Sequence, residues 1–504
     1  MIHSRTEISP AALLAVLLLV TGCASHGPSA RSETDAPADT IAENGYSLSG
    51  NGNRVARRGA AVVQGGVLLA RSFPADAVNR PVSNVLSIGS YALKSAGGFA
   101  HRLVIGAAQF PALEASEIPA VNSGGAMDLA EWEQELDRIT GRKSSRGSID
   151  LLVDGQEYFD RMLEAVDSAE DSIDVRTYIF DNDDFAVEVA DHLREKSRDV
   201  DIRVMFDGLG NLMALQTDPD SMPAGFRPPI SMEQYLENDS QVRVRTLSNP
   251  WMTGDHTKTT IIDRKIAFIG GMNIGREYRY DWHDLMMEVR GPIVDQLTHD
   301  SDKAWAKAGF LGDVAYLLTS LRGKERIAES QGYPVRTLYT REFDSEIYQA
   351  QLAAIRRAKR YIYIENSYFS DDATLYELSR ARRRGVDVRV VLPADGNHGS
   401  HDASNAVAIE RMLRNGIRVY RYPGMSHVKA AVIDGWASIG TANFDKLSLQ
   451  VNKEVNLATS HPGFVNELLE RVFYADIEMS DEVSEAPDLT LQARLLEMVV
   501  DEVL

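Results

Sequence analysis

The sequence predicts an α/β protein that is built from two similar lobes, packed against each other as an intramolecular pseudo-dimer. The main evidence is a duplicated motif, because most features of Asp255–Asp263 recur in Ser426–Asp434. Flanking segments recur as well, and Val200–Val204 matches Val386–Val390. Segments with the apolar pattern of strands also alternate with segments that have helical spacing. Such a repeat indicates a duplicated unit whose two copies are related by a pseudo-twofold axis.

Both repeats are expected to contain the same order of strands and helices. In the first repeat, Ile173–Phe180 and Val200–Phe206 have the character of strands, and Phe185–Ser197 between them has helical spacing. In the second repeat, Tyr361–Ser367 and Val386–Leu392 are the matching strands. Because strands that alternate with helices usually pair in parallel, we expect a mostly parallel sheet that is covered on both faces.

Composition and patterning divide the 504 residues into six segments. A hydrophobic fraction of 44% and a charged fraction of 25% are typical of globular domains. The expected segments are a lipoprotein signal peptide, a flexible tether, an accessory region that packs on the core or the membrane, two lobes, and a tail with a short helix. Their bounds, in that order, are residues 1–23, 24–58, 59–147, 148–322, 335–475 and 476–504.

The N-terminus has the features of an export signal. Arg5 is followed by the apolar run Ala11–Val20, which is too short to span a bilayer comfortably, and the run ends in small residues before Cys23. This ending resembles the lipobox of bacterial lipoproteins, which implies that Cys23 is acylated. Because Cys23 is the only cysteine, a disulfide within the chain is excluded. Since Ala24 rather than Asp follows it, the resemblance favours a lipid anchor in the outer membrane, facing the periplasm, over one in the inner membrane.

The repeated motif contains residue types that suit a phosphodiester. Residues two apart on a strand face the same side, so His256 and Lys258 point together, and so do His427 and Lys429. A phosphodiester needs a nucleophile at phosphorus, an acid for the departing alkoxide and positive charge near the oxygens. Two imidazoles and two ammonium groups meet these needs, so neither a metal nor a cofactor is expected. The net charge of −20 argues against a general nucleic-acid binder.

The spacing of the motif resembles that of the phospholipase D superfamily. In both copies the His-x-Lys pair is followed after four residues by Asp, and then by Gly270-Gly271-Met272-Asn273 or Gly440-Thr441-Ala442-Asn443. The resemblance covers about residues 150–475 and implies two α/β/α sandwich lobes of the phospholipase D type. The flanking segments Lys265–Tyr278 and Arg384–Pro393 look like those of bacterial cardiolipin synthases.

The resemblance also implies a role for each motif residue. His256 would form a phosphohistidine intermediate and His427 would be the general acid and later the base, although the sequence alone leaves the reverse assignment open. Lys258 and Lys429 would contact the non-bridging oxygens. Asn273 and Asn443 would be amide donors for the phosphate. Asp284 and Glu454 would be the acids that orient the imidazoles. Asp263 and Asp434 would complete the catalytic motif and tie its strands to the scaffold.

Three further histidines have weaker signals. His283 lies beside Asp284, and it is interpreted either as a neighbour that supports the site or as polar surface. His398 and His401 are interpreted as members of an ordinary polar loop, because no cysteine and no matching ligand spacing accompany them. None of the three is therefore assigned to the reaction.

Three classes of function remain open from the sequence. The leading one is a phosphatidyltransferase, tethered to the membrane through Cys23, that acts as a cardiolipin synthase on phosphatidylglycerol, with phosphatidylethanolamine as a further candidate substrate. With water as the acceptor, the same chemistry gives a phospholipase D. An exported nuclease is disfavoured by the acidic charge, and a non-catalytic scaffold is disfavoured because neither copy has lost its His or Lys. Because an anionic body would repel an anionic membrane, we also expect a locally basic face near the site.

Overall fold

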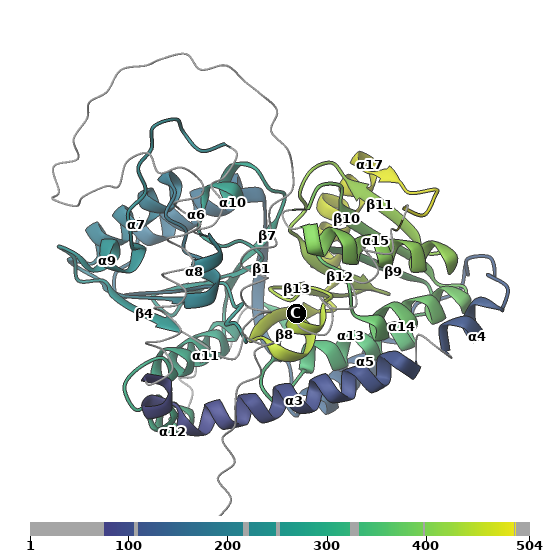
Figure 1. Ribbon diagram of the computed structural model, residues 1–504, viewed down its shortest axis with the longest axis horizontal. Coiled ribbons are helices and arrows are strands. Elements are labelled where there is room, and N and C mark those ends of the chain that lie inside the picture. The colour runs from purple at the N-terminus through teal and green to yellow at the C-terminus, as the bar shows by residue number, and fades with distance from the viewer. Residues whose placement is uncertain are drawn as a thin grey trace, which may run out of the picture.

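One continuous sheet forms the centre of the molecule. The computed structural model describes residues 75–104, 109–214, 221–247, 253–322, 332–396, 399–487 and 489. Within them, a 15-stranded sheet runs through both lobes in the order β15-β11-β10-β9-β12-β13-β14-β8-β1-β7-β6-β5-β2-β3-β4 (Figure 1). The expected signal peptide with Cys23, the tether and the short helix of the tail lie outside the described residues.

The strand order on one side of the sheet's centre mirrors the order on the other side. β1 and β8 pair at the centre. From the centre outward, the first lobe contains β1 (Ser145–Val153), β7 (Leu285–Arg290), β6 (Ile266–Gly270), β5 (Thr259–Ile262), β2 (Ser172–Thr177), β3 (Asp201–Asp207) and β4 (Arg243–Leu247). The second lobe contains β8 (Tyr333–Thr340), β14 (Glu454–Thr459), β13 (Trp436–Gly440), β12 (Lys429–Ile433), β9 (Tyr361–Asn366), β10 (Asp387–Pro393) and β11 (Arg418–Tyr422), with β15 (Asp481–Glu482) at its edge. The predicted duplication of an α/β unit is confirmed.

Helices cover both faces of this sheet, as the sequence predicted. On one face, separate cores form under the helices of each lobe. These helices are α6 (Asp154–Asp167), α7 (Asp184–Lys196), α9 (Met232–Glu237) and α10 (Arg276–Tyr280) in the first lobe, and α13 (Glu346–Arg357), α14 (Asp372–Arg383) and α15 (Gly399–Arg414) in the second. The short helix α8 (Gly208–Ala214) follows β3.

On the other face, the two lobes share one core. Ile149 and Ile261 of the first lobe belong to the same buried cluster as Val428 and Leu457 of the second. Helices of both lobes cover it, namely α11 (Ile293–Lys307), α16 (Pro462–Leu468) and the π-helical segment η3 (Leu469–Tyr474), and α17 (Ala475–Met479) follows them. Because apolar burial stabilises this interface, the lobes are held in a fixed arrangement.

The expectation of a mostly parallel sheet is wrong. In the described sheet, parallel pairing is restricted to β2–β3–β4 and to β9–β10–β11, and the other adjacent strands are antiparallel. The physical reason lies in the short connections, because β5 and β6, like β12 and β13, are joined by turns of a few residues. Such turns connect antiparallel neighbours, whereas parallel neighbours need a longer crossover.

The first lobe begins earlier than the expected boundary at residue 148. β1 starts at Ser145, and Ser145–Gly147 pairs with β8, so these residues form the seam between the lobes. Gly147 also leaves room for neighbours in its own lobe, because a Cβ there would lie 2.6 Å from the side chain of Ile293 and 2.7 Å from the carbonyl oxygen of Arg290. β8 likewise starts at Tyr333, before the expected residue 335.

The described part of the accessory region consists of α3 (Pro81–Val104), α4 (Phe110–Glu114) and α5 (Leu129–Thr140). α5 packs on the second lobe, where the rings of Trp132 and Trp436 meet edge to face with centroids 5.1 Å apart. α3 lies beside α12 (Gly312–Leu321) at the edge of the molecule (Figure 1). No helix among the described residues is long and apolar enough to cross a bilayer.

Each motif strand is preceded by its motif histidine and followed by its motif aspartate. Asp263 follows β5, and Asp434 follows β12. Asp263 accepts hydrogen bonds from the backbone N–H groups of residues 170–172. Asp434 accepts them from residues 359–361 and from Met127. Both aspartates have positive φ angles, of 51° and 49°, at the turn that leaves the strand. These contacts fit the structural role expected of the pair.

We predict that Asp263→Asn lowers the free energy of unfolding at pH 7 by about 1–2 kcal/mol, because three backbone N–H groups lose a carboxylate acceptor. Burial alone would raise the pKa of Asp263, but these N–H groups outweigh it and hold the pKa below its ordinary value. Stability that comes from a lowered pKa is present above the unfolded-state pKa of about 4 and is lost as pH falls through the folded-state pKa. Urea unfolding at pH 7 and pH 3 should therefore show the difference shrinking at the lower pH.

The matched control is Asp171→Asn, since the Asp171 side chain is 75% exposed and lies in the same turn region. We expect it to leave the unfolding curve unchanged. Equal destabilisation by the two substitutions would contradict the role assigned to Asp263.

Candidate active site

The two motif histidines lie at the starts of the motif strands, and each is held by the backbone of the other lobe. His256 precedes β5, and its N–H donates to the carbonyl oxygen of Lys453 at 3.0 Å. His427 precedes β12, and its N–H donates to the carbonyl oxygen of His283 at 2.7 Å. The two contacts are equivalent under the pseudo-twofold symmetry, because the bridges Asp255↔Lys453 and His283↔Ser426 are both parallel. A short backbone segment of each lobe therefore pairs with the motif segment of the other lobe.

The carboxylates predicted to orient the imidazoles also come from the opposite lobes. Nδ1 of His256 lies 2.9 Å from Oε1 of Glu454, and Nδ1 of His427 lies 2.6 Å from Oδ2 of Asp284. Both carboxylates are buried. A carboxylate at Nδ1 keeps the proton on that nitrogen and leaves Nε2 for chemistry. Each half of the site is therefore completed by an acid that lies on the other repeat.

The two motif lysines are buried beneath the histidines. Lys258 Nζ donates to the carbonyl oxygen of His256 at 2.9 Å, and Lys429 Nζ donates to that of His427 at 2.6 Å. Lys429 also donates to Oγ of Ser367 at 2.8 Å. Burial, with Lys429 acting in the same direction, lowers the pKa of Lys258 to about 7, and burial lowers the pKa of Lys429 to about 8. An anion bound between the two ammonium groups would oppose both effects.

The histidine and acid pKa values show how strongly the site is desolvated. Burial, together with Lys258 and Lys429, lowers the pKa of His256 well below 6.5, so this imidazole is neutral at neutral pH. Burial raises the pKa of Asp284 to about 7 and raises that of Glu454 well above its ordinary value, while the lysines oppose both shifts. Because Lys429 of the second lobe acts on His256 of the first, the two motifs form a single site.

The two asparagines occupy different environments. Oδ1 of Asn273 accepts the N–H of Ile179 at 3.0 Å, and its Nδ2 donates to the hydroxyl of Tyr278 at 2.7 Å. The ring of Tyr278 is edge-on to His427, with centroids 5.5 Å apart. Asn443 is buried, and its Oδ1 has no hydrogen-bond partner in the described structure. Asn273 is therefore engaged by protein groups on both sides of its amide, whereas Asn443 retains a free acceptor.

The acid–histidine pairs differ in one structural detail that the sequence explains. A Cβ on Gly271 would lie 2.1 Å from Oδ1 of Asp284, so only glycine leaves room for this carboxylate. In the second lobe Thr441 occupies the equivalent position, and its hydroxyl donates to Glu454. Asp284, the shorter acid, therefore lies against Gly271. Glu454, the longer acid, is held by the hydroxyl of Thr441.

Sequence reasoning missed two tyrosines that line the site. The ring of Tyr178 meets His256 edge to face at 4.9 Å, and the ring of Tyr368 meets His427 at 6.4 Å. The repeat gave no signal for them, because Phe180 matches Phe369, so Tyr178 matches Ser367 and not Tyr368. His401 stacks on Tyr368 at 4.1 Å from the first turn of α15. The expectation that His401 belongs to an ordinary polar loop is therefore wrong, and His398 lies outside the described residues.

His283, which had two interpretations, is buried beside the site. Its Nδ1 lies 2.7 Å from Asp154 and its Nε2 lies 3.1 Å from Asp476. Burial alone would lower the pKa of His283, but the hydrogen bonds to these acids raise it well above 6.5. Together with Glu365 and Asp476, His283 is the group of described residues whose spacing could hold a metal ion, with ligand atoms within 4.8 Å of one another. As an imidazolium, His283 supplies the positive charge that these buried acids need.

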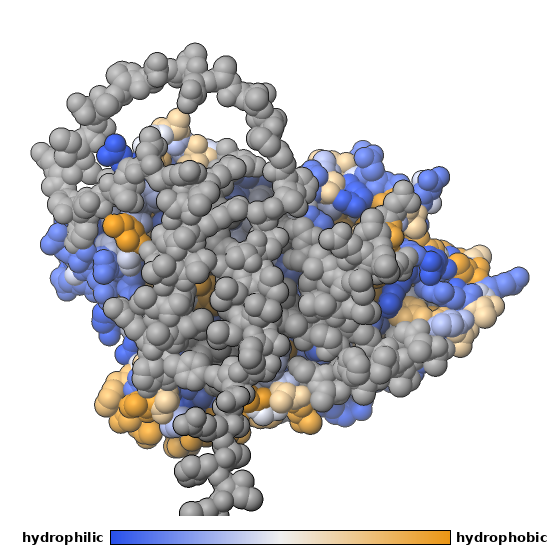
Figure 2. All heavy atoms as spheres, viewed as in Figure 1, coloured by the Kyte–Doolittle hydropathy of each residue, from blue (hydrophilic) through white to orange (hydrophobic). Residues whose placement is uncertain are grey.

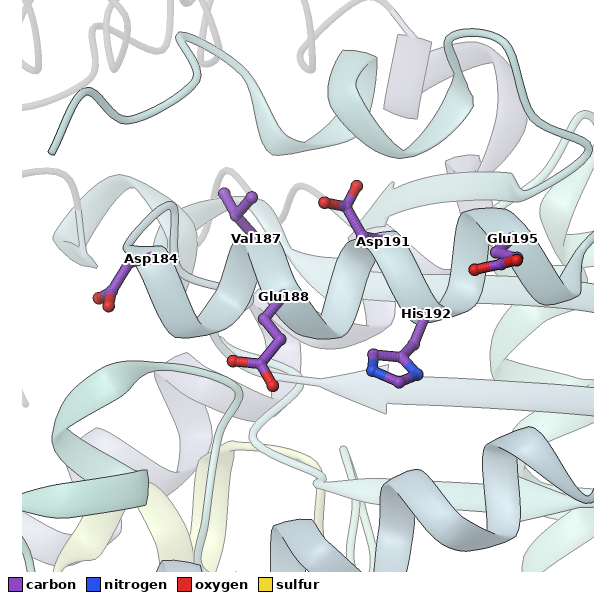
Figure 3. A pocket seen from close by; sticks show the side chains of 6 residues that line it. All are labelled: Asp184, Val187, Glu188, Asp191, His192 and Glu195. Atoms are coloured by element: carbon purple, nitrogen blue, oxygen red, sulfur yellow. The ribbon is translucent and has the colours of Figure 1, made fainter. Parts of the chain in front are cut away.

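Two hollows lie outside the pair of histidines. The one in Figure 3, of about 400 Å³, is lined only by side chains of α7, which are mostly acidic and none of which is buried. The other, of about 40 Å³, reaches Thr257 and Glu454 of the site. Five basic side chains line it, against three acidic ones, and they are Arg176, Lys303, Lys307, Arg341 and Lys453. Most of these basic groups are paired with Asp300 or Glu342, so the basic face expected near the site stays a prediction.

Comparison with known proteins identifies the family. A family model described as "Cardiolipin synthase, PLD-like domain" matches residues 162–305 and 352–476, more than half of the chain. The protein belongs to the phospholipase D superfamily. The two matched segments correspond to the two lobes, which agrees with the duplicated phospholipase D fold expected from the motif.

Curated relatives of this phospholipase D-like chain cover most of its length. It is 26% identical over 363 residues to cardiolipin synthase A of Pseudomonas putida, and this alignment covers 68% of this chain and 70% of the relative. It is 27% identical over 372 residues to cardiolipin synthase 1 of Bacillus cereus, with 68% and 69% covered. Among solved structures, phosphatidylserine synthase of Haemophilus influenzae superposes with a TM-score of 0.57 at 14% identity, over 74% of this chain and 99% of the other. That similarity shows the fold.

We predict that Asp284→Asn lowers kcat on a phosphodiester substrate by about 10²–10⁴-fold. An amide at Nδ1 of His427 can stabilise the tautomer without a proton on Nδ1, and it does not stabilise the imidazolium form. KM should change little, because the substrate contacts remain. Glu454→Gln should do the same through His256. The control is Asp281→Asn, at an exposed position just before Asp284. A loss confined to KM would contradict the orienting role.

We also predict that His283→Gln lowers the free energy of unfolding at pH 6 by about 3 kcal/mol, because it breaks a buried ion pair. Stability from a raised histidine pKa is fully present below the unfolded-state value of about 6.5 and is lost as pH rises through the folded-state pKa. Urea unfolding between pH 6 and pH 9 should show the variant approaching the wild type as pH rises. His192→Gln, at a partly exposed histidine that contacts Asp167, is the control and should have little effect. A difference that does not depend on pH would show that His283 is not held as a cation.

Proposed function

We propose that this protein is a phosphatidyltransferase of the phospholipase D superfamily that joins two phosphatidylglycerol molecules into cardiolipin and releases glycerol. The observation that carries the proposal is the pair of imidazoles with carboxylates at Nδ1 and two buried lysines below them. This arrangement provides the groups that phosphodiester exchange needs. The choice of substrate is supported by relatives that are named cardiolipin synthases and match about two thirds of the chain.

In the first step, Nε2 of His256 attacks the phosphorus of phosphatidylglycerol. The P–O bond to the glycerol headgroup breaks, and His427 gives a proton to the departing alkoxide, so that glycerol leaves. His256 is available as a nucleophile because its lowered pKa keeps the imidazole neutral. Lys258 and Lys429 hold the non-bridging oxygens, where negative charge is concentrated. The product of this step is a phosphatidyl-histidine.

In the second step, a hydroxyl of the headgroup of another phosphatidylglycerol attacks the phosphorus. His427 removes the proton from that hydroxyl, and the N–P bond to His256 breaks. The new P–O bond completes cardiolipin and restores both imidazoles. With water in place of the lipid hydroxyl, the same step yields phosphatidic acid, which is the phospholipase D reaction. The acceptor thus decides between the two activities.

The proposal includes a position in the cell envelope. The lipobox-like segment that ends at Cys23 supports lipidation at that residue and an anchor that faces the periplasm, with the outer membrane favoured. An enzyme whose substrates are membrane lipids gains from such an anchor, because the anchor confines the active site to the surface that supplies them.

The test of the function is a lipid-product assay in mixed micelles. We expect the purified protein to form labelled cardiolipin from labelled phosphatidylglycerol alone, and both His256→Ala and His427→Ala to reduce this by about a thousandfold or more. A parallel reaction with added phosphatidylethanolamine identifies the second substrate. Phosphatidic acid without cardiolipin would make the protein a phospholipase D. If the folded protein turns over no lipid, the substrate proposal fails.

A second experiment assigns the two histidines. A phosphatidyl ester of p-nitrophenol has a leaving group that needs no acid, so it can load the nucleophile without help from the other imidazole. We expect His427→Ala to accumulate a phosphatidyl-enzyme that is stable in alkali and labile in acid, as phosphohistidine is, and His256→Ala to accumulate none. Accumulation on His256→Ala instead would reverse the assignment.

A further inference from the structure

The N-terminal helix α3 is amphipathic in the reverse of the usual sense. Among residues 75–94, every residue that is exposed is apolar or glycine. These residues are Ala75, Ala77, Val78, Pro81, Val82, Val85, Leu86, Ile88, Gly89, Ala92 and Leu93. The exposed fraction reaches 68% at Val85 and 72% at Leu93. A soluble surface helix normally places its apolar stripe against the core and its polar residues in water.

The polar side chains of α3 face the protein and fix the helix in this orientation. The hydroxyl of Ser90 donates to the carbonyl oxygen of Glu342, and Lys94 donates to that of Gln450. Just before the helix, Arg80 is buried against Asp76. Rotating the helix to hide its apolar side would break these bonds and leave buried polar groups unpaired. The outward direction of the apolar side chains is therefore a built feature of the fold.

A second helix continues the apolar surface. In and next to α12, the large exposed side chains are Phe310, Leu311, Val314, Tyr316, Leu317, Leu318 and Leu321. Asp313 accepts the N–H groups of Val82 and Ser83 at 2.8 and 3.1 Å, so it caps the start of α3 and joins the two helices. Figure 2 shows hydrophobic residues gathered along this lower edge of the molecule. We call residues 75–94 and 310–322 the apolar face.

The charge of the apolar face indicates which partner covers it. Among the described residues of this face, no acidic side chain is exposed, and the one exposed charge is the cation of Arg322. The whole chain, in contrast, has a net charge of −20. A face without exposed acids avoids the repulsion that anionic lipid headgroups would exert on the rest of the surface. Large exposed apolar patches mark protein or membrane contacts, and this charge pattern favours a membrane.

One residue of the apolar face lies near the residues that support the active site. The hollow of about 40 Å³ is lined by Tyr316 of α12 at one side and by Thr257 and Glu454 of the site at another. Glu454 is the carboxylate that holds His256. A bilayer that contacts α12 would therefore lie near the residues that support His256.

We propose that the apolar face formed by α3 and α12 docks into the headgroup and acyl boundary of a bilayer that contains anionic phospholipid. The inference rests on the proposed function, because that function places the substrates in such a bilayer. A helix whose apolar side enters this boundary binds in proportion to the apolar area that it buries. The acyl chain at Cys23 would tether the protein, and the apolar face would orient it.

The experiment uses the single cysteine of the chain. In the full chain with Cys23→Ser, one new cysteine is introduced by Val85→Cys or Leu318→Cys on the apolar face, or by Ile230→Cys as the control, and each is labelled with an environment-sensitive dye. Ile230 is 58% exposed, as is Leu318, but it lies outside both helices. On vesicles of phosphatidylglycerol and phosphatidylethanolamine, we expect a blue shift of the dye at positions 85 and 318 and none at 230.

Three results would overturn the proposal. The first is no shift at positions 85 and 318, or an equal shift at 230. The second is a blue shift without vesicles that grows with protein concentration, which would assign the face to a second copy of this chain. The third is a blue shift without vesicles that is independent of concentration, which would show that another segment of the chain covers the face.

Charged substitutions separate docking from catalysis. Val85→Asp with Leu318→Asp should weaken vesicle binding by about tenfold or more, whereas Ile230→Asp should not. All variants should retain wild-type turnover of a water-soluble short-chain phosphatidylglycerol, because none of these residues belongs to the catalytic site. Docking without any lipid turnover would refute the proposed function alone. Turnover of the soluble lipid with vesicle binding unaffected by the two substitutions would refute the docking alone.

Discussion

The structure depends on one exchange between the lobes. The carboxylate that orients each motif histidine belongs to the other repeat, in the pairs His256–Glu454 and His427–Asp284. Backbone bonds between the same segments accompany these pairs. Neither lobe therefore contains a complete half of the site. The shared core on one face of the sheet and the seam between β1 and β8 hold the two halves in register.

This exchange places an unusual amount of charge in a desolvated space. Two lysines, two acids and two imidazoles lie together, and burial shifts the acids and the lysines towards their neutral forms. Such a cluster is costly without an anion, because each buried charge loses its hydration. In the proposed function, a phosphodiester would supply negative charge next to the lysines. The site thus favours an anionic substrate and a neutral His256 for the same reason, which is exclusion of water.

The use of polar side chains for contacts within the protein also explains why the surface of α3 is apolar. α3 uses its serines, its lysine and the capping by Asp313 to hold the protein, and it leaves its apolar residues outside. A water-soluble enzyme with a soluble substrate would have no use for such a helix. For an enzyme that draws its substrate from a bilayer, the apolar face and the active site are parts of one task.

The sequence by itself determined the duplication, the two His-x-Lys motifs and the acids that follow them, because spacing along a chain is preserved in a repeat. It also predicted the alternation of strands and helices, which local periodicity encodes. Only the tertiary structure decided that each acid serves the histidine of the other lobe, that most strand pairs are antiparallel, that Tyr178 and Tyr368 line the site, and that α3 faces outward. These features arise from contacts between residues that are far apart in the chain, and burial, charge and hydrogen bonding at such contacts are set by the partner that folding supplies.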